Sequence, residues 1–249
     1  MINISIFLSL LLLMVIPQDN NDFKNRQLKY TRVKSAYAEK RQTIKSLLST
    51  KGISDDKFLL FIRIFKKEEV MEVWVKGSHH HRYQHLKDYK FCANSGRLGP
   101  KRKSGDRQIP EGFYFIDRFN PVSNFHLSLG INYPNRSDKT LGHKENPGGD
   151  IFLHGGCATI GCVPITDDKI KGLYILAVEA KNNGQNKIPV HIFPGRAIKE
   201  AQWRKLSASA DDGLVHFWKN LKPGYDHFEK NRQIPGIKVK QNGDYYMAE

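Results

Sequence analysis

Two side chains that could share covalent chemistry lie in one short segment of the chain, His154 and Cys162. A thiol becomes a strong nucleophile when a neighbouring base takes its proton, and imidazole is suited to that task near neutral pH. The apolar run Ile151 to Leu153 predicts a short buried strand that delivers His154 at its end. Glycines around both residues permit unusual torsions and close approach to a substrate. The pattern predicts a cysteine nucleophile paired with a histidine base.

The same segment resembles the catalytic motif of the YkuD-like L,D-transpeptidases, and within them the YafK-type branch. That motif pairs a His-Gly with a later Ser/Thr-x-Gly-Cys, which His154-Gly155 and Thr159-Ile160-Gly161-Cys162 match. Two positions depart from the commoner pattern, since Ile160 replaces a second histidine and Pro164 replaces an arginine. Further segments are also similar to the family, so the resemblance covers residues 55–195 and is more specific than one short motif.

The resemblance implies a mainly β domain with flanking helices (α+β), built on a mixed β-sheet or sandwich. It also implies acyl transfer on peptidoglycan stem peptides, at a bond that follows an L-centre and precedes a D-centre. Cys162 would attack the carbonyl and form a thioester, while His154 would take the thiol proton and return it to the leaving amine. Pairing with a protonated histidine would lower the thiol pKa from its usual ~8.5.

Several further residues receive roles from the same resemblance. The carbonyl of Gly155 would orient the imidazole, and the N–H groups of Gly161 and Cys162 would stabilise the oxyanion. Thr159, Tyr133 and Arg136 are expected to contact the substrate. No metal and no other cofactor is expected.

A basic loop precedes the segment Pro110 to Phe115. It carries Arg97, Lys101, Arg102, Lys103 and Arg107 among glycines. Most of these charges are expected to lie exposed to solvent. Because arginine suits bidentate binding of carboxylates, one or two of them could contact substrate carboxylates.

Three other functions stay open at this point. A hydrolase or amidase of the same fold would cleave links to the stem peptide, because water and an amine attack the same thioester. A zinc site built from His143, His154, Cys157 and Cys162 is disfavoured, since their spacing fits no familiar zinc pattern. A non-catalytic wall-binding module is supported by charge alone.

The cysteine count and the charge constrain the compartment and the partners. Three cysteines, Cys92, Cys157 and Cys162, do not make a disulfide framework, and an odd number predicts at least one free thiol. Cys157 is expected to be a small core residue, with a redox partnership with Cys162 as the alternative. The net charge of +15 favours an anionic polymer or membrane surface, or simply a solvated basic surface. Nucleic acid is disfavoured because no recognisable binding motif is present.

The first residues, Met1 to Ile16, are almost entirely apolar. This stretch is shorter than the ~20 residues that span a bilayer, and we interpret residues 1–18 as an export signal or an uncleaved N-terminal anchor. The protein is therefore expected in the periplasm or cell envelope, with possible membrane association through its N-terminus. The sequence leaves the oligomeric state open.

Periodicity predicts the remaining elements and the domain organisation. A helical segment over residues 19–54 is followed by the catalytic domain at 55–195 and a helical extension at 196–249. Strands are expected at 58–65, 70–75, 86–93, 113–116, 125–134, 151–153 and 188–193. A helix is expected from an N-cap at Thr166 to Gly184, and a second from Leu214 to a stop at Pro223.

Overall fold

A curled eight-stranded sheet forms the centre of the computed structural model, which describes residues 21–53, 57–196, 204–205, 208 and 210–248. The strand order is β3-β2-β1-β8-β4-β5-β6-β7. Neighbouring strands are antiparallel except for the pairs β1–β8 and β6–β7, which are parallel. The strands span Phe58–Phe65 (β1), Val70–Gly77 (β2), Gln84–Lys90 (β3), Gly112–Asn120 (β4), Ser128–Ile131 (β5), Phe152–His154 (β6), Val163–Pro164 (β7) and Ile188–Phe193 (β8). The mainly β, α+β architecture predicted from the sequence is confirmed.

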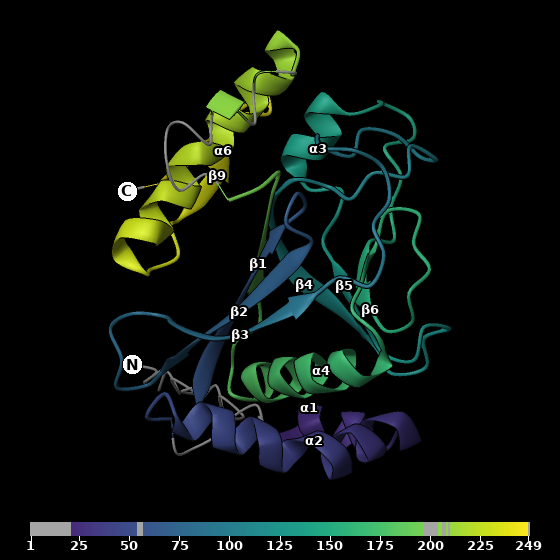
Figure 1. Cartoon of the computed structure of the whole chain (residues 1–249), viewed down its shortest axis with the longest axis vertical. Helices are drawn as coiled ribbons and strands as arrows, with labels where there is room; N and C mark the ends of the chain where they lie inside the picture. The colour runs from purple at the N-terminus through teal and green to yellow at the C-terminus, as the bar shows by residue number, and fades with distance from the viewer. Residues whose placement is uncertain (1–20, 54–56, 197–203, 206–207, 209, 249) are drawn as a thin grey trace, which may run out of the picture.

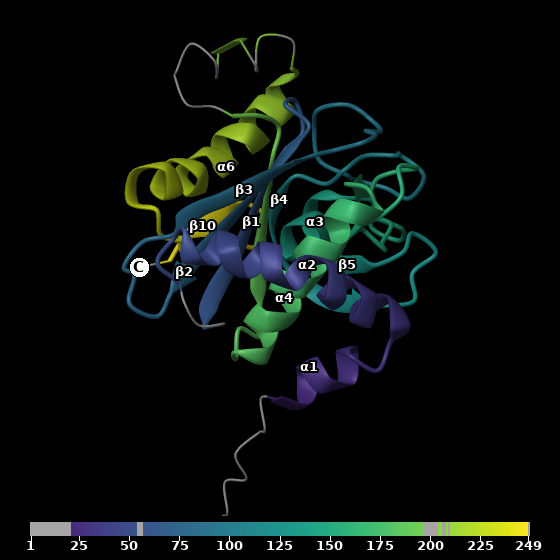
Figure 2. The same ribbon diagram turned by 60° about the horizontal axis from the view of Figure 1, so that its bottom comes forward.

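Helices cover both faces of the sheet, as Figure 1 shows. Helix α4 (Asp167–Asn182) lies against one face, with α1 (Asn21–Gln27) and α2 (Thr31–Ser49) outside it. Helix α6 (Asp212–Asn231) lies on the other side, and α3 (Arg136–Leu141) lies near one end of it. Figure 2 shows α2 crossing in front of α4. The layers explain why the central strands β1 and β8 are largely apolar, since both of their faces are buried.

Strand β1 shows this division most clearly. Its side chains alternate between the two faces, as strand geometry requires. Leu60, Ile62 and Ile64 join the larger core with α2 and α4. Phe61 and Phe65 join the smaller cores with aromatic side chains of α6. The N-terminal and C-terminal extensions therefore pack on opposite faces of one strand.

The helix expected within residues 19–54 is two helices. Tyr30 has an extended backbone (φ −86°, ψ 130°), which ends α1 and precedes α2. Both helices are held to α4 by buried hydroxyl groups: Tyr37 donates to Glu179 Oε1 at 2.9 Å, and Tyr174 donates to Gln27 Oε1 at 2.7 Å. These contacts, which join residues far apart in the sequence, fix where the N-terminal segment packs.

The prediction that Pro223 stops the C-terminal helix is wrong, because α6 continues to Asn231. Proline removes one helix hydrogen bond. Beyond it, Tyr225 and Phe228 are buried against the sheet, at 3% and 1% exposure, so packing offsets the lost bond. A hairpin of β9 (Ile237–Val239) and β10 (Tyr245–Met247) follows.

One expectation falls on the N-terminal residues that the structure does not describe. The signal or anchor expected at residues 1–18 lies outside the described residues. Within those residues, we find no helix with the length and apolar character needed to cross a membrane.

Candidate active site

His154 ends β6 and Cys162 directly precedes β7, and these two short strands are parallel neighbours. Leu153 is paired with Val163, and both side chains are fully buried in the core. His154 follows Leu153 within β6, so its side chain lies on the opposite face from Leu153. Cys162 stands one residue before β7, and its Sγ lies beside the backbone of β6 at Phe152.

The imidazole of His154 is fixed on two sides. Its Nδ1 lies 2.5 Å from the carbonyl oxygen of Gly155, so Nδ1 carries the proton and Nε2 has a free lone pair. The ring of Phe125 packs against it with centroids 4.5 Å apart. Burial lowers the pKa of His154 below its usual value, against the opposing effect of the Gly155 hydrogen bond. The neutral imidazole is therefore the resting form.

Gly155 is required at its position for steric reasons. A Cβ atom there would lie 2.6 Å from the carbonyl oxygen of Phe125. Its carbonyl group contacts His154 in the way expected from the sequence, and its N–H donates to the carbonyl of Leu127 at 3.2 Å. The next N–H, that of Gly156, donates to Asp167 Oδ1 at 2.7 Å. Thr166, the expected helix cap, makes no side-chain cap hydrogen bond and has a positive φ of 76°; its neighbour Asp167 binds the loop instead.

Cys162 has a free, partly buried thiol. Its Sγ accepts from the N–H of Phe152 at 3.4 Å and lies 3.5 Å from the carbonyl oxygen of Asp150. Burial raises the pKa of this thiol, and Asp150 adds to the effect, while the Phe152 N–H and Lys101 oppose it. The lowered thiol pKa expected from the sequence is therefore replaced by a raised one. Both members of the pair are neutral at rest.

Thr159 organises the turn before Cys162. Its hydroxyl accepts from the N–H groups of Gly161 at 3.2 Å and Cys162 at 2.9 Å, and donates to the carbonyl of Cys162 at 2.8 Å. These bonds use the full capacity of one hydroxyl group. The two N–H groups assigned to an oxyanion are thus already bound, and Thr159, expected to touch the substrate, holds the loop.

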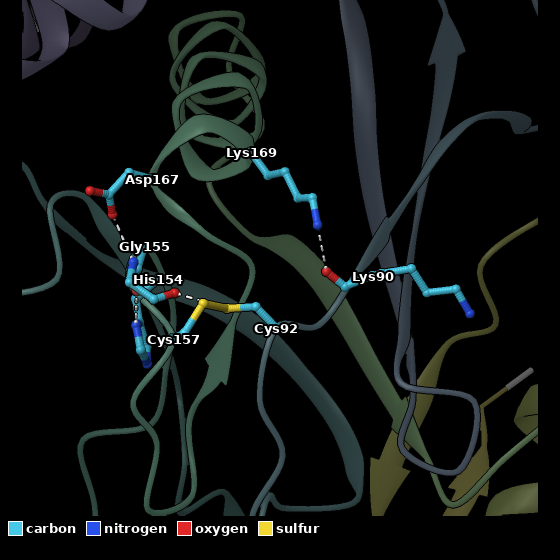
Figure 3. The surroundings of a disulfide bond; sticks show 8 residues. Lys90, Cys92, His154, Gly155, Cys157, Asp167 and Lys169 are labelled. Atoms are coloured by element: carbon cyan, nitrogen blue, oxygen red, sulfur yellow. Dashed lines mark hydrogen bonds between the residues drawn. A yellow bond between two sulfur atoms is a disulfide. The ribbon is translucent and has the colours of Figure 1, made fainter.

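Cys157 is exposed and forms a disulfide with Cys92, so the prediction that it is a small core residue is wrong, and so is the alternative of a redox partnership with Cys162. The Cα atoms are 5.4 Å apart although 65 positions separate them in the sequence. Figure 3 shows the bond beside His154 and Gly155. The N–H of Cys92 also donates to Pro164 at 3.1 Å. The disulfide therefore ties the segment after β3 to the loop that carries both candidate catalytic residues.

The disulfide also removes the four-residue zinc set, because a disulfide sulfur cannot act as a thiolate ligand. His143 lies elsewhere in a turn, where its Nδ1 accepts from the N–H of Asn146 at 3.2 Å. Across the described residues, no group of three or more His, Cys, Asp or Glu side chains has a geometry that could hold a metal ion.

Tyr133 and Arg136 have other surroundings than expected. Tyr133 is 5% exposed, and its hydroxyl donates to the carbonyl of Pro147 at 2.8 Å. Burial raises the pKa of this hydroxyl. Tyr133 nevertheless lines the same shallow hollow as Arg136, and its contact with substrate stays a prediction. Arg136 is exposed at the start of α3, in a shallow hollow with Lys139 and Lys144. Arg136 makes none of the contacts that join Cys162 to Phe152 and Asp150.

Sequence reasoning missed Arg118, a charged group that contacts Phe152 and Asp150, the two residues whose backbone groups lie beside Cys162 Sγ. The register aligns Arg118, Gly130 and Phe152 across three strands. The Arg118 guanidinium lies 4.8 Å from the Phe152 ring and 2.6 Å from Asp150 Oδ1. Gly130 makes room for this contact, because a Cβ atom there would lie 2.8 Å from Arg118 Nε. The alignment of these three residues follows from the strand register, which cannot be determined from the sequence.

Comparisons with known proteins identify the family of the chain. Residues 60–192 match the family model "YkuD: L,D-transpeptidase catalytic domain". The chain is 36% identical over 191 residues to an Escherichia coli (strain K12) protein named "Putative L,D-transpeptidase YafK", a match that covers 76% of this chain and 74% of that protein.

Solved structures show lower similarity. The helical cell shape determining protein Pgp2 from Campylobacter jejuni is 18% identical with a TM-score of 0.45, over 74% of each chain. Bd1075 from Bdellovibrio bacteriovorus is 23% identical with a TM-score of 0.41, over 73% of this chain and 65% of that one. The extent of the family match and the identity to the E. coli protein decide the assignment: the chain belongs to the YkuD family of L,D-transpeptidase catalytic domains, in its YafK-type branch.

Proposed function

We propose that the protein performs L,D-transpeptidase-type acyl transfer on peptidoglycan stem peptides, with Cys162 as nucleophile and His154 as base. Membership of the family supports a peptidoglycan-related role. One observation supports the mechanism: His154 ends β6 and Cys162 directly precedes the parallel neighbour β7, with the Nδ1 proton of His154 held by Gly155. The base nitrogen Nε2 is thereby left free to accept the thiol proton.

Because the Cys162 thiol and the His154 imidazole are both neutral at rest, the reaction begins with a proton transfer between them. As Sγ of Cys162 attacks the substrate carbonyl, its proton passes to Nε2 of His154. The imidazolium then gives this proton to the leaving amine, and a thioester remains on Cys162. An acceptor amine attacks the thioester, loses a proton to His154, and releases Cys162 as the thiol when that proton returns. The carbonyl of Gly155 stabilises the transient imidazolium.

An oxyanion can bind at this turn only if the hydrogen bonds of Thr159 change. The hydroxyl oxygen of Thr159 accepts from the N–H groups of Gly161 and Cys162, which are the donors that the oxyanion needs. A developing oxyanion is a stronger acceptor than a neutral hydroxyl, so it competes well for those donors. In this proposal the substrate carbonyl displaces or shares the Thr159 contact as negative charge develops.

Hydrolysis is the second candidate function, and the partial exposure of the thiol supports it. Cys162 is only partly buried, so water has access to a thioester formed there. Water in place of the acceptor amine gives a hydrolase or amidase that cleaves links to the stem peptide. The two reactions share every step up to the thioester.

We further propose that the protein is exported and acts in the periplasm or cell envelope. The apolar stretch at residues 1–16 supports this, either as a signal or as a membrane anchor. The Cys92–Cys157 disulfide adds support, because such bonds persist in oxidising compartments. Fractionation of cells that express the full chain, followed by immunoblotting, tests the location; recovery in the cytoplasm alone would refute it.

Incubation with purified peptidoglycan fragments tests the reaction. Mass spectrometry of the products distinguishes cross-linked stems, which indicate transfer, from shortened or released stems, which indicate cleavage. Cys162→Ala serves as the blank. Products of equal yield from the wild type and Cys162→Ala, or no products from either, would refute the proposed function.

A further inference from the structure

A pocket of about 510 Å³ lies between the basic loop and the start of α6. Arg97, Arg102 and Gln108 line it from the loop, while Leu214, Phe217 and Trp218 line it from the helix. The helix side belongs to the C-terminal extension, outside residues 60–192 that match the family model. The pocket thus combines a basic wall with an apolar one, which is typical of sites for small amphipathic ligands.

One buried carboxylate joins the two walls. Glu111 is fully buried, and its Oε2 accepts from the indole N–H of Trp218 at 2.6 Å. Its Oε1 accepts from the N–H of Gly99 at 2.7 Å and pairs with Lys66 at 3.0 Å. The helix wall and the loop wall are therefore fixed to the same group, and the pocket is built in advance of any ligand.

The arginines give the pocket a preference for anions. The guanidinium of Arg102 stacks on the ring of Phe217, with 4.8 Å to the ring centroid. Its NH1 is a buried atom without a hydrogen-bond partner among the described residues, and it forms an ion pair with Asp138 Oδ1 at 3.7 Å, which partly offsets its charge. Arg97 is exposed at the rim. Asp211 opposes these two charges, but its Oδ1 accepts from the N–H of Leu214 as the helix cap.

The pocket adjoins the candidate nucleophile through Gln108. The carbonyl oxygen of Gln108 lies against Gly161, the residue before Cys162: a Cβ atom on Gly161 would be 3.0 Å from it. Lys101, next to Arg102 in the same loop, is close enough to Cys162 to lower the pKa of its thiol. Gln108 therefore borders both the pocket and the turn that carries Cys162.

We propose that this pocket is a substrate subsite that binds a free carboxylate of a peptidoglycan stem peptide through Arg97 and Arg102. Leu214 and Phe217 contact the apolar part of the same peptide. Two guanidinium groups on one wall suit a carboxylate, which each can bind with paired hydrogen bonds. The choice of peptide rests on the proposed function, whereas the preference for a carboxylate rests on the pocket itself.

Binding to a full chain that cannot turn over tests the subsite directly. Cys162→Ala protein is titrated with a synthetic stem peptide carrying free carboxylates and with the same peptide amidated, by calorimetry. We expect amidation to weaken binding at least tenfold. In Arg97→Gln and Arg102→Gln, made in the same background, the free-acid peptide should bind more weakly and the difference between the two peptides should shrink.

Matched controls separate this outcome from general charge effects and from misfolding. Arg41→Gln removes an exposed arginine of α2 and should leave the difference between the peptides unchanged. Because Arg102 also packs on Phe217, Arg97→Gln supplies the variant whose side chain is exposed and whose fold is not at risk. Undiminished discrimination in both pocket variants, equal loss for both peptides, or no binding by the Cys162→Ala parent would overturn the subsite.

A kinetic arm with intact Cys162 distinguishes this failure from failure of the proposed reaction. Arg97→Gln should raise KM for the free-acid peptide about tenfold, with kcat within about twofold of the wild type. Turnover of both peptides without a preference for the free acid over the amidated form would refute the subsite but not the reaction. Discrimination in binding without any turnover would refute the reaction and leave the subsite standing.

Discussion

The hydroxyl of Thr159 binds Cys162 on both sides, accepting from its N–H at 2.9 Å and donating to its carbonyl at 2.8 Å. The same oxygen accepts from Gly161, where φ is +134° and a side chain would be strained. One threonine thus sets the backbone on which the candidate nucleophile sits. Its role in the turn makes it a positioning residue.

Replacing Thr159 tests that role. Thr159→Val keeps the shape but removes three hydrogen bonds, so kcat should fall about 10- to 100-fold as Cys162 loses its alignment. Unfolding free energy should fall by roughly 1–3 kcal/mol, because two N–H groups lose their partner. Thr159→Ser keeps the hydroxyl and should stay within a few-fold of the wild type. Steady-state kinetics and urea denaturation give both quantities; full activity in Thr159→Val would show that the turn holds without it.

The disulfide provides a second prediction. Reduction of Cys92–Cys157 should lower the free energy of unfolding by roughly 2–5 kcal/mol and reduce activity, because the bond holds the loop between β6 and β7. The double variant Cys92→Ser/Cys157→Ser should resemble reduced wild type and be insensitive to reductant. Thermal denaturation with and without dithiothreitol measures the effect. Equal melting temperatures in all four samples would contradict a structural role for the bond.

Titration of the Cys–His pair provides a third prediction. Burial raises the pKa of Cys162 and lowers that of His154, so both are neutral between the two values. Iodoacetamide, which reacts with the thiolate, should therefore label resting Cys162 with a midpoint above the ~8.5 of a free thiol. Activity should fall only at a pH below the usual ~6.5 of histidine, because burial lowers the pKa of His154 and protonation removes the base.

His154→Ala separates the two effects. Turnover should be lost, while the alkylation midpoint should move little, because the causes that raise the thiol pKa are burial and Asp150. Cys92 and Cys157 are bonded to each other, so the label in unreduced protein reports Cys162. Complete labelling of the wild type well below pH 7 would mean that a thiolate–imidazolium pair exists at rest.

The buried pair of Lys66 and Glu111 provides a fourth prediction. Glu111→Gln leaves the Lys66 ammonium, 2% exposed, without its carboxylate, and should cost about 3–5 kcal/mol of stability. Glu145→Gln removes an exposed carboxylate and should change stability by less than about 0.5 kcal/mol. Chemical denaturation of the three proteins measures the difference. Similar stabilities would show that the pair contributes little.

The sequence predicted the elements whose signal is local. Strands β1 and β8 were placed with both ends correct, because dense apolar runs stand between polar segments at those positions. The family was also predicted correctly. The pairing of His154 with Cys162, which the motif indicates, stays a prediction.

Contacts between distant segments could not be predicted in this way. Nothing near Cys157 in the sequence indicates Cys92 as its partner. The row of Arg118 and Phe152 depends on the pairing of three strands. Helix α6 passes through Pro223 because aromatic side chains beyond it pack on the sheet, an effect that no local signal contains. The raised thiol pKa follows from burial, which only the folded chain displays.

The most direct measurement of the central claim is a mapped covalent intermediate. Wild type, Cys162→Ala and His154→Ala are mixed with a synthetic stem peptide, quenched in acid at short times and analysed by intact-mass and peptide-mapping mass spectrometry. We predict an acyl adduct on Cys162 in the wild type, cleaved by hydroxylamine as thioesters are, and no adduct in Cys162→Ala or His154→Ala. An adduct on another residue, or undiminished turnover in Cys162→Ala, would contradict the proposed nucleophile.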